Sequence, residues 1–391
     1  MFAITKKGSK RAALIALPLA FALGLSACSS GSVSGDSTKA ADDSSKFSSI
    51  IPSGDIVQFS KDLVEGSLTA TKGFTPPSTG PKAQKNGAHV AFVGSDLTNG
   101  GVNTVSTGVQ EAATAIGWTV DVYDGKATAQ GRTDALNQAI AAQPAAIILG
   151  GFDATEQAAT IKQATDAGIP VVGWHAGSAA GAGNGLFTNV TTDPLVVSQL
   201  AAAYAVADSN GKAGAAIFTD GQYDIAVLKA DAMKAYIEAC KTCSVLDYED
   251  SPIAEADTRM PGIISNLLQQ YGDKLTYLLA INGNYFGGAQ QALRAAGTDP
   301  AGTPKSVAAG DGDSAEFKRI RDVDYQAATV AEPLILQGWQ LVDEINRAFA
   351  GEKESGFIAA PGLITAKNVP TGDVFDPASG YRDVYTKVWG K

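Results

Sequence analysis

Residues 89–94, His-Val-Ala-Phe-Val-Gly, form a short apolar run that ends at a glycine. Runs of the same kind follow it, at 119–123, 145–149 and 171–174. Stretches with helical spacing of apolar residues separate them, at 105–117, 132–142 and 155–167. Apolar runs that bury both faces, alternating with such helices, are typical of a parallel sheet covered by helices. The sequence therefore predicts a β-α-β-α-β-α-β lobe that begins near residue 87.

The same rhythm starts again at residue 197. Further strands are predicted at 215–218, 244–248, 275–281, 306–309 and 327–330. Helical stretches lie before, between and after them, at 197–208, 225–239, 258–271, 287–296, 315–322 and 333–350. The expected fold class is α/β, with two doubly wound parallel-sheet lobes. In such open sheets ligands sit beyond the carboxyl ends of the strands, and two facing lobes form a cleft there. Residues that follow strands are therefore the candidates for ligand contact.

The first 27 residues are typical of a secretion signal rather than of a folded domain. A basic segment at 6–11 precedes an apolar run at 12–24, which is too short for a permanent membrane helix of roughly 20 residues. The run ends in Leu-Ser-Ala-Cys at 25–28, and small residues are what signal peptidases need before the cut. A cysteine directly after them resembles the lipobox of bacterial lipoproteins, so we expect Cys28 to be lipidated. The alternative is an ordinary secretory signal with an incidental cysteine.

The next segment, 28–86, is expected to be a flexible tether followed by a surface strap. Residues 29–49 are rich in Ser, Gly, Asp and Lys, and such a segment buries too little apolar surface to offset its ordering entropy. Residues 50–85 carry scattered apolar side chains and a Pro-Pro pair at 76–77. We expect them to lie along the surface of the domain.

The net charge of the chain restricts the classes of molecule that it can bind. The formal charge is −10, and it becomes about −14 once the basic signal is removed. An acidic chain is a poor fit to nucleic acid, which requires clustered Lys and Arg.

The glycine-rich stretch 181–185 carries no lysine and follows no strand directly, so it predicts a flap near the cleft rather than a phosphate loop.

Two of the three cysteines, Cys240 and Cys243, are separated by two residues. In a cytosolic protein this spacing would indicate a redox site or half of a metal site. In an oxidising exported compartment it favours a short disulfide. A zinc site needs two more ligands, and the two histidines, His89 and His175, are distant in sequence. We therefore expect no metal and no cofactor.

Several local patterns occur in the order found in type I periplasmic binding proteins of the ribose/galactose-binding group. They are the strand with Ser-Asp-Leu at 89–98, Ala-Gly-Ile-Pro-Val-Val at 167–172, Ala-Ile-Asn-Gly-Asn at 280–284, Ala-Gly-Asp-Gly at 309–312 and Ala-Ala-Thr-Val-Ala-Glu at 327–332. Over about residues 88–370 the chain resembles this group. With its signal, it resembles the lipoprotein component of an ABC sugar importer.

The resemblance implies two lobes joined by a three-segment hinge, with the ligand in the cleft between them. It places the crossings near Asn189, Glu332 and Leu363. The expected N-terminal lobe is 87–189 plus 333–362, and the expected C-terminal lobe is 190–332 plus 363–391.

The resemblance also implies which residues bind the solute. Asn282 matches a strand-end Asn, and Asp311 matches an Asp that accepts hydrogen bonds from sugar hydroxyls. Glu332 stands where a hinge Gln is usual, and Lys229 stands about where an Arg is usual. The alternatives are turn capping for Asn282 and Asp311, and solvated helix faces for Lys229 and Glu332.

The sequence departs from the ribose-type pattern at two places. Gly-Gly-Val-Asn at 100–103 replaces an aromatic pair, and His175-Ala176, preceded by Trp174, replaces an Asp-Arg pair. Losing the Arg removes a fixed fork of donors, whereas His175 supplies one donor and one acceptor when neutral. Trp174 offers an apolar face to a sugar. The alternatives are a core tryptophan and a histidine satisfied within the core.

Four further residues that follow strands are candidates for the cleft. Asp96 is a candidate ligand contact, with helix capping as its alternative. Tyr285 is another, together with Tyr223 and Phe286, and core packing is the alternative for all three.

We therefore expect an extracytoplasmic solute-binding lipoprotein that closes around a small polar solute, such as a sugar or polyol, and delivers it to an ABC permease. The mixed charges of the candidate site favour a neutral ligand with several hydroxyls. The expected location is the outer face of the cell membrane, through the lipid anchor, and the expected state is a monomer. No Ser-His-Asp set, metal cluster or paired carboxylates indicate an enzyme. The alternative function is a ligand-sensing lipoprotein of the same fold that signals to a membrane receptor.

Overall fold

The computed structural model describes residues 46–70 and 72–391. The predicted signal, the lipidation candidate Cys28 and most of the tether lie outside the described residues. Within the described part of the chain, no helix is long and apolar enough to cross a membrane.

The first sheet has the strand order β2-β1-β3-β4-β6-β5. Its strands are β1 (His89–Gly94), β2 (Thr119–Asp124), β3 (Ala146–Gly150), β4 (Val171–Trp174), β5 (Gly181–Gly183) and β6 (Leu186–Val190). All neighbours in it are parallel except β5 and β6. In β1, β3 and β4 buried residues make both faces, which is why these runs show no alternation of apolar and polar residues. The edge strand β2 alternates and is partly exposed.

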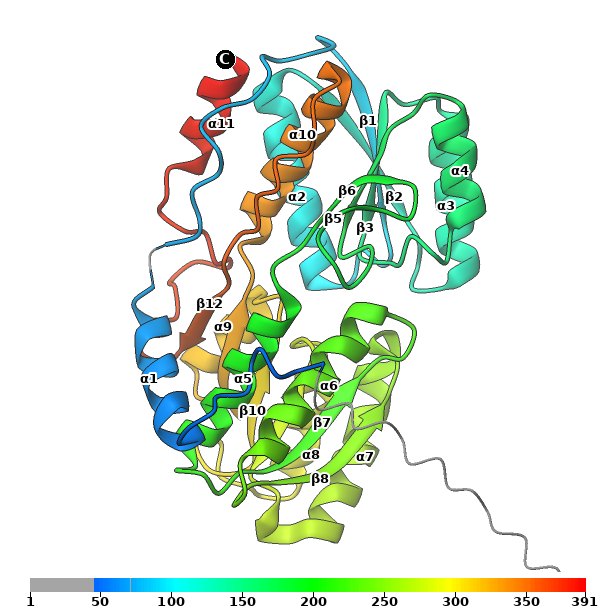
Figure 1. The fold of residues 1–391 in the computed structure, drawn as a ribbon. Helices are drawn as coiled ribbons and strands as arrows, with labels where there is room; N and C mark the ends of the chain where they lie inside the picture. Colours follow the sequence, from blue (N-terminus) through cyan, green and yellow to red (C-terminus); the bar gives the residue numbers. More distant parts are fainter. Residues whose placement is uncertain (1–45, 71) are drawn as a thin grey trace, which may run out of the picture. The chain divides into compact units, whose positions relative to one another are not determined.

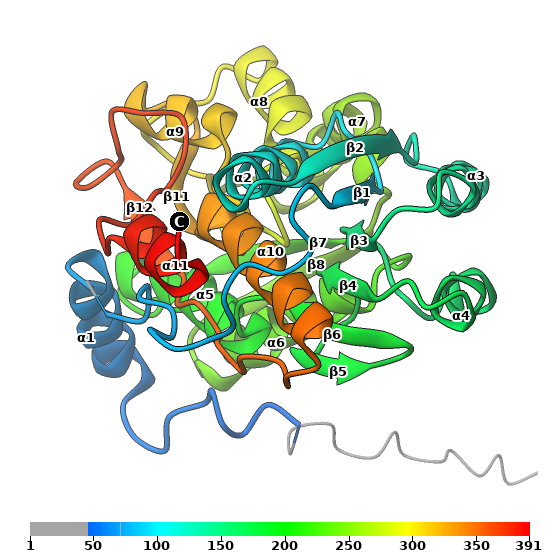
Figure 2. The same ribbon diagram turned by 90° about the horizontal axis from the view of Figure 1, so that it is seen from above.

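Helices cover this sheet on both faces (Figure 2). They are α2 (Gly100–Ile116), α3 (Ala129–Ala141), α4 (Ala158–Asp166), α10 (Leu334–Ala350) and α11 (Tyr381–Trp389). Residues of α2, α10 and α11 share one apolar core with the sheet, and residues of α3 and α4 share another. We call this sheet and these helices the first lobe.

The second sheet has the order β12-β11-β10-β9-β7-β8, and only β12 is antiparallel to its neighbour. Its strands are β7 (Gly214–Thr219), β8 (Ser244–Asp250), β9 (Tyr277–Ala280), β10 (Lys305–Ala308), β11 (Gln326–Ala331) and β12 (Gly362–Thr365). The helices around it are α5 (Pro194–Asp208), α6 (Asp224–Ala239), α7 (Ala256–Tyr271), α8 (Tyr285–Ala295) and α9 (Ser314–Arg321), with short 3-10 turns η2 (Ile253–Glu255) and η3 (Gly272–Lys274). This second lobe completes the two predicted α/β lobes (Figure 1).

The chain crosses between the two sheets more than once. It leaves the first sheet after β6, returns after β11 into α10, and reaches the second sheet again at β12. The tail differs from the expected division, which places 363–391 in the second lobe. In α11, Trp389 stacks on Trp339 of α10 with ring centroids 5.5 Å apart. Aromatic side chains at helical spacing bury this face of α11 in the first lobe, so residues 381–389 belong there.

The segment before β1 lies along both lobes, as expected for a strap. Helix α1 (Ile56–Leu68) packs against α5, and Ser60 Oγ lies 2.9 Å from the hydroxyl of Tyr236 in α6. Further on, the carbonyl of Gln84 accepts a hydrogen bond from Trp118 Nε1 of the first lobe. The dark blue α1 and the blue chain beyond it follow this course in Figure 1.

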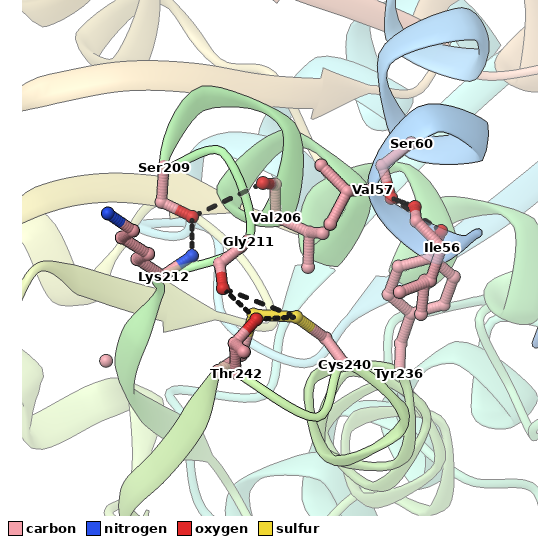
Figure 3. Close-up of a disulfide and its surroundings, with 12 residues drawn as sticks. Ile56, Val57, Ser60, Val206, Ser209, Gly211, Lys212, Tyr236, Cys240 and Thr242 are labelled. Atoms are coloured by element: carbon pink, nitrogen blue, oxygen red, sulfur yellow. Dashed lines mark hydrogen bonds between the residues drawn. A yellow bond between two sulfur atoms is a disulfide. The ribbon is translucent and has the colours of Figure 1, made fainter.

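The structure joins Cys240 and Cys243 by a disulfide at the end of α6, with Cα atoms 5.3 Å apart. The bond closes the turn between α6 and β8. Beside it, Thr242 Oγ1 donates to the carbonyl of Gly211, and a Cβ at Gly211 would lie 2.7 Å from Val57 of α1 (Figure 3). The disulfide therefore lies beside the contact between α1 and the second lobe.

Candidate functional site

A cavity of about 70 Å³ lies between the two lobes, at the carboxyl ends of their strands. The first lobe contributes the residues that follow β1, β3 and β4, and the second lobe contributes those that follow β9 and β10 together with α6. Its polar lining residues are Ser95, Asp96, Asn99, His175, Tyr223, Lys229, Asn282 and Asp311. The geometry matches the rule that ligands of open α/β sheets bind beyond the carboxyl edge.

Glu332 lies behind the polar wall of this cavity and holds two residues of that wall in place. It is fully buried between β11 and α10 and does not itself line the cavity. Its Oε1 accepts a hydrogen bond from Lys229 Nζ at 3.0 Å, and its Oε2 accepts from His175 Nε2 at 3.0 Å and from Thr192 Oγ1. Burial alone would raise the pKa of Glu332, but the charge of Lys229 and the interactions with His175 hold it well below its usual range. The site therefore contains an ionised glutamate that fixes a lysine and a histidine.

His175 is held in place from two further directions. Its φ of 48° lies in the left-handed region, which is uncommon for a residue other than glycine. Its ring stacks on Trp174 with centroids 4.1 Å apart and planes 13° apart. Trp174 Nε1 in turn donates to Gln337 Oε1 of α10 at 2.9 Å. Trp174 is 2% exposed, so it supports His175 and offers the cavity little surface.

Asp311 supplies the cavity with a carboxylate that has no hydrogen-bond partner among the described residues. The residue is 7% exposed and has a φ of 63°. Burial raises its pKa to about 6, opposed by the charge of Lys229. An unpartnered buried acceptor is costly unless a ligand supplies the donor. This carboxylate is suited to accept from hydroxyl groups of a solute.

Asn282 and Asp96 lie on opposite walls of the cavity. Asn282 Oδ1 accepts from the backbone N–H of Asn284 at 3.3 Å, and its amide nitrogen has no partner among the described residues. Asp96 Oδ1 accepts from the backbone and the hydroxyl of Thr98, at 2.9 and 2.7 Å. Both residues thus cap turns, which is the alternative role that the sequence suggested for them. Both also line the cavity.

The lobes also meet beside the cavity through a hydrogen bond between a backbone N–H of one lobe and a side-chain carboxylate of the other. Asp153, which follows β3, accepts on Oδ2 from the N–H of Asp224 at the start of α6, at 2.9 Å. Burial raises the pKa of Asp153 to about 6. The ring of Tyr223 lies next to the guanidinium of Arg132, with 5.8 Å between the ring centre and Cζ. These contacts close one side of the cleft.

The structure corrects the expectation for Tyr285. Its side chain is fully buried in the core of the second lobe, and its hydroxyl donates to the carbonyl of Ser251 at 2.8 Å. Phe286 packs in the same core. Both lie on the inner face of α8 because this amphipathic helix turns that face towards the sheet. Tyr223 lines the cavity instead, and burial raises its pKa to about 12, so its hydroxyl stays protonated.

Sequence reasoning missed several lining residues. They are Ser95, Asn99, Val102, Ala127, Gly151, Ile225, Ala226, Ile253, Ala254 and Ile281. Asn99 could have been predicted, because it lies in the loop after β1. Its side chain caps α2 by accepting hydrogen bonds from the backbone N–H groups of Gly101 and Val102. Most of the others are small or apolar and carry no such signal.

Three acidic or imidazole groups approach one another closely enough to be tested as a metal site. Ligand atoms of His175, Asp311 and Glu332 lie within 4.8 Å of one another. The ammonium group of Lys229 is 3.0 Å from Glu332 and repels a second cation there. The donor set therefore fits a hydrogen-bonding solute better than a metal ion.

Comparisons with known proteins agree with this geometry. Residues 90–353 match the family described as "Periplasmic binding protein domain". No curated protein matches the sequence.

Three solved structures with a similar fold are described as solute- or sugar-binding proteins. An ABC transporter solute-binding protein from Agrobacterium vitis, bound with alpha-D-tagatopyranose, has 19% identity and a TM-score of 0.62, over 73% of this chain and 96% of its own. The arabinose ABC transporter component from Shewanella sp. ANA-3, bound to L-arabinofuranose, has 20% identity and a TM-score of 0.62, over 77% and 95%. A glucose-galactose binding protein from Geobacillus stearothermophilus has 19% identity and a TM-score of 0.64, over 73% and 100%.

At these identities the solved structures show the fold alone, whereas the family match covers more than half of the chain. With its two α/β lobes and a polar cavity between their strand ends, the chain belongs to the periplasmic binding protein family.

Proposed function

We propose that this protein is an extracytoplasmic solute-binding lipoprotein that delivers a small, neutral, multi-hydroxyl solute, a sugar or polyol, to an ABC import permease. The observation that carries the proposal is the cavity between the lobes, where the unpartnered carboxylate of Asp311 faces fixed donors. The titles of similar structures name sugars as their ligands, which supports the same solute class.

The residues divide the work of binding by their chemistry. Asp311 accepts hydrogen bonds from hydroxyls, and Asn282, Lys229 and Tyr223 donate to hydroxyl oxygens. Glu332 fixes the donors, and Trp174 fixes the ring of His175. Lys229 and Glu332 neutralise each other, so the cavity has no surplus positive charge to bind an anion. Closing of the lobes around the solute requires no chemical step.

Calorimetry tests the solute class. The chain with Cys28→Ser, which cannot be acylated, is titrated with pentoses, hexoses and hexitols and, as a contrasting set, with amino acids and aromatic acids. We expect tight binding of a sugar or polyol and none from the contrasting set. Binding of an amino acid with no binding of any sugar or polyol overturns the proposal.

Lipid anchoring through Cys28 is tested separately. We expect the mature chain to partition with membranes and to carry acyl mass on its N-terminal cysteine. With Cys28→Ala, the chain is expected in the aqueous fraction. A wild-type chain that is cleaved but carries no acyl group contradicts the anchoring part of the proposal. Co-purification of the solute-loaded chain with a permease and its ATPase supports transport, whereas co-purification with a receptor kinase supports signalling instead.

A further inference from the structure

A second cavity of about 480 Å³, which we call the outer cavity, opens directly beside the ligand cavity. The two cavities share four lining residues: Asp96, Asn99, Ile253 and Ala254. The first pair belongs to the loop after β1 in the first lobe, and the second pair belongs to η2 in the second lobe. The two cavities therefore adjoin between the lobes.

The inner cavity has room for one small unit only. Its volume of about 70 Å³ is a small fraction of the volume of the outer cavity, about 480 Å³, so it admits only a small unit such as one sugar ring or a short polyol. The outer cavity is several times larger and begins where the inner one ends. A solute that fills both has an inner unit and an attached outer unit.

The outer cavity offers hydrogen-bonding groups with spare capacity. The carboxylate of Asp257, an exposed residue at the start of α7, and the side-chain amide of Asn284, a half-buried residue at the start of α8, have no hydrogen-bond partner among the described residues. Asp313 keeps one oxygen free, because Oδ1 alone accepts from the N–H of Glu316. Arg319 is engaged by Gln326 and by the carbonyl of Gly283.

The described lining of the outer cavity contains no aromatic ring, and Ile253 is its one large apolar side chain. Free carboxylate and amide groups without an aromatic face fit hydroxyls rather than an apolar substituent. The first lobe contributes Gly100 to this lining. A Cβ at Gly100 would lie 2.5 Å from Asp313 Oδ2, so a larger residue there would displace this carboxylate.

We propose that the solute is a two-unit, hydroxyl-rich glycoside, with one sugar in the inner cavity against Asp311 and a second polar unit in the outer cavity against Asp257 and Asn284. The proposal rests on the function proposed above and names its substrate class. The unpartnered carboxylate of Asp311, which is 7% exposed, marks the inner cavity as a ligand site. The adjoining outer cavity extends that site.

Calorimetry with matched ligands tests the proposal. Each pentose and hexose is compared with its methyl glycoside and with the disaccharide that carries a second sugar on it, and each hexitol is compared with the glycoside that carries a sugar on one of its hydroxyls. We expect one disaccharide to bind at least roughly tenfold more tightly than its inner monosaccharide. The reason is that each added hydrogen bond to a charged group makes the free energy of binding more favourable. In Asp257→Asn and Asn284→Ala, the ratio of disaccharide to monosaccharide affinity is expected to fall several-fold.

The control is Asp383→Asn, which removes an exposed carboxylate in the first turn of α11 that lines neither cavity. It should leave the ratio unchanged, so a fall that is specific to Asp257 reports on the outer cavity rather than on a helix terminus. A monosaccharide that binds tightly while every extended form binds worse overturns this inference and leaves the proposed function standing. If no sugar, polyol or glycoside binds, the proposed function fails as well.

Discussion

Nε2 of His175 donates to Oε2 of Glu332 at 3.0 Å, although the two residues are 157 positions apart in the chain. His175 follows a strand of the first lobe, and Glu332 lies where the chain passes back from the second lobe. The same glutamate holds Lys229 of the second lobe. One carboxylate thus fixes donors that come from both walls of the cleft.

Glu332→Gln tests this arrangement. The substitution keeps an acceptor but removes the charge that lies 3.0 Å from the ammonium group of Lys229, and breaking a buried pair in this way costs about 3–5 kcal/mol. We expect a loss of that order in the free energy of unfolding, measured with urea, together with weaker solute binding. Glu352→Gln is the control, because its partner Arg347 is 3.6 Å away and its own side chain is 48% exposed. An exposed pair is worth about 1 kcal/mol at most, and equal losses in the two variants would contradict the account.

Asp311 predicts a pH dependence with a defined sign. Burial raises its pKa from 3.8 to about 6 in the folded chain, so the folded state binds the proton more tightly than the unfolded state. The stabilisation from this proton is fully present below about pH 4 and is lost as the pH rises through 6. Between pH 7 and pH 4, the free energy of unfolding of the wild type should rise by on the order of 3 kcal/mol relative to that of Asp311→Asn. The difference between the two chains isolates Asp311 from the other buried carboxyl groups, and a difference that does not vary with pH would rule this assignment out.

Tyr223 and Tyr285 form a matched pair for separating binding from folding. Tyr223 lines the cavity, whereas Tyr285 donates to the carbonyl of Ser251 inside the core. We expect Tyr223→Phe to weaken solute binding about threefold to tenfold, and Tyr285→Phe to lower stability by about 1 kcal/mol with unchanged affinity. Calorimetry and urea unfolding of both variants provide the check. The reverse pattern would place Tyr285 back in the site.

The strap is predicted to contribute to the fold. Phe74 is 3% exposed and packs edge-on against Phe375 of the tail, with ring centroids 5.6 Å apart. Phe74→Ala should cost about 3 kcal/mol, the lower end for truncating a buried phenylalanine. Phe59→Ala, at a position of α1 that is 38% exposed, should cost much less. If thermal unfolding shows no difference between the two variants, the strap is not part of the cooperative unit.

The sequence predicted the structural features that depend on a single strand or a single short segment. The apolar runs predict both sheets because their residues are buried on both faces. Asp311 and Asn282 could be found because polar residues that directly follow buried strands reach the carboxyl edge of the sheet. The cysteine spacing and the exported compartment together predicted the disulfide.

The sequence was less informative about the direction of a side chain, about strands without strand-forming residues and about contacts between distant segments. Tyr285 follows β9 as closely as Asn284 does, but its helix turns the ring into the core. The hairpin of β5 and β6 was missed because Gly181–Gly183 has no strand-forming side chains. The placement of α11 depends on Trp339 and Trp389, which lie 50 residues apart and meet only in the folded chain. The outer cavity exists only because loops of both lobes face each other.

Mass spectrometry of the ligand retained by natively purified protein tests the central claim most directly. The account predicts a neutral, polyhydroxylated compound of one or two sugar units, which is lost when Asp311 is replaced by alanine. Retention of an amino acid, an aromatic acid or a metal ion in its place would contradict the account.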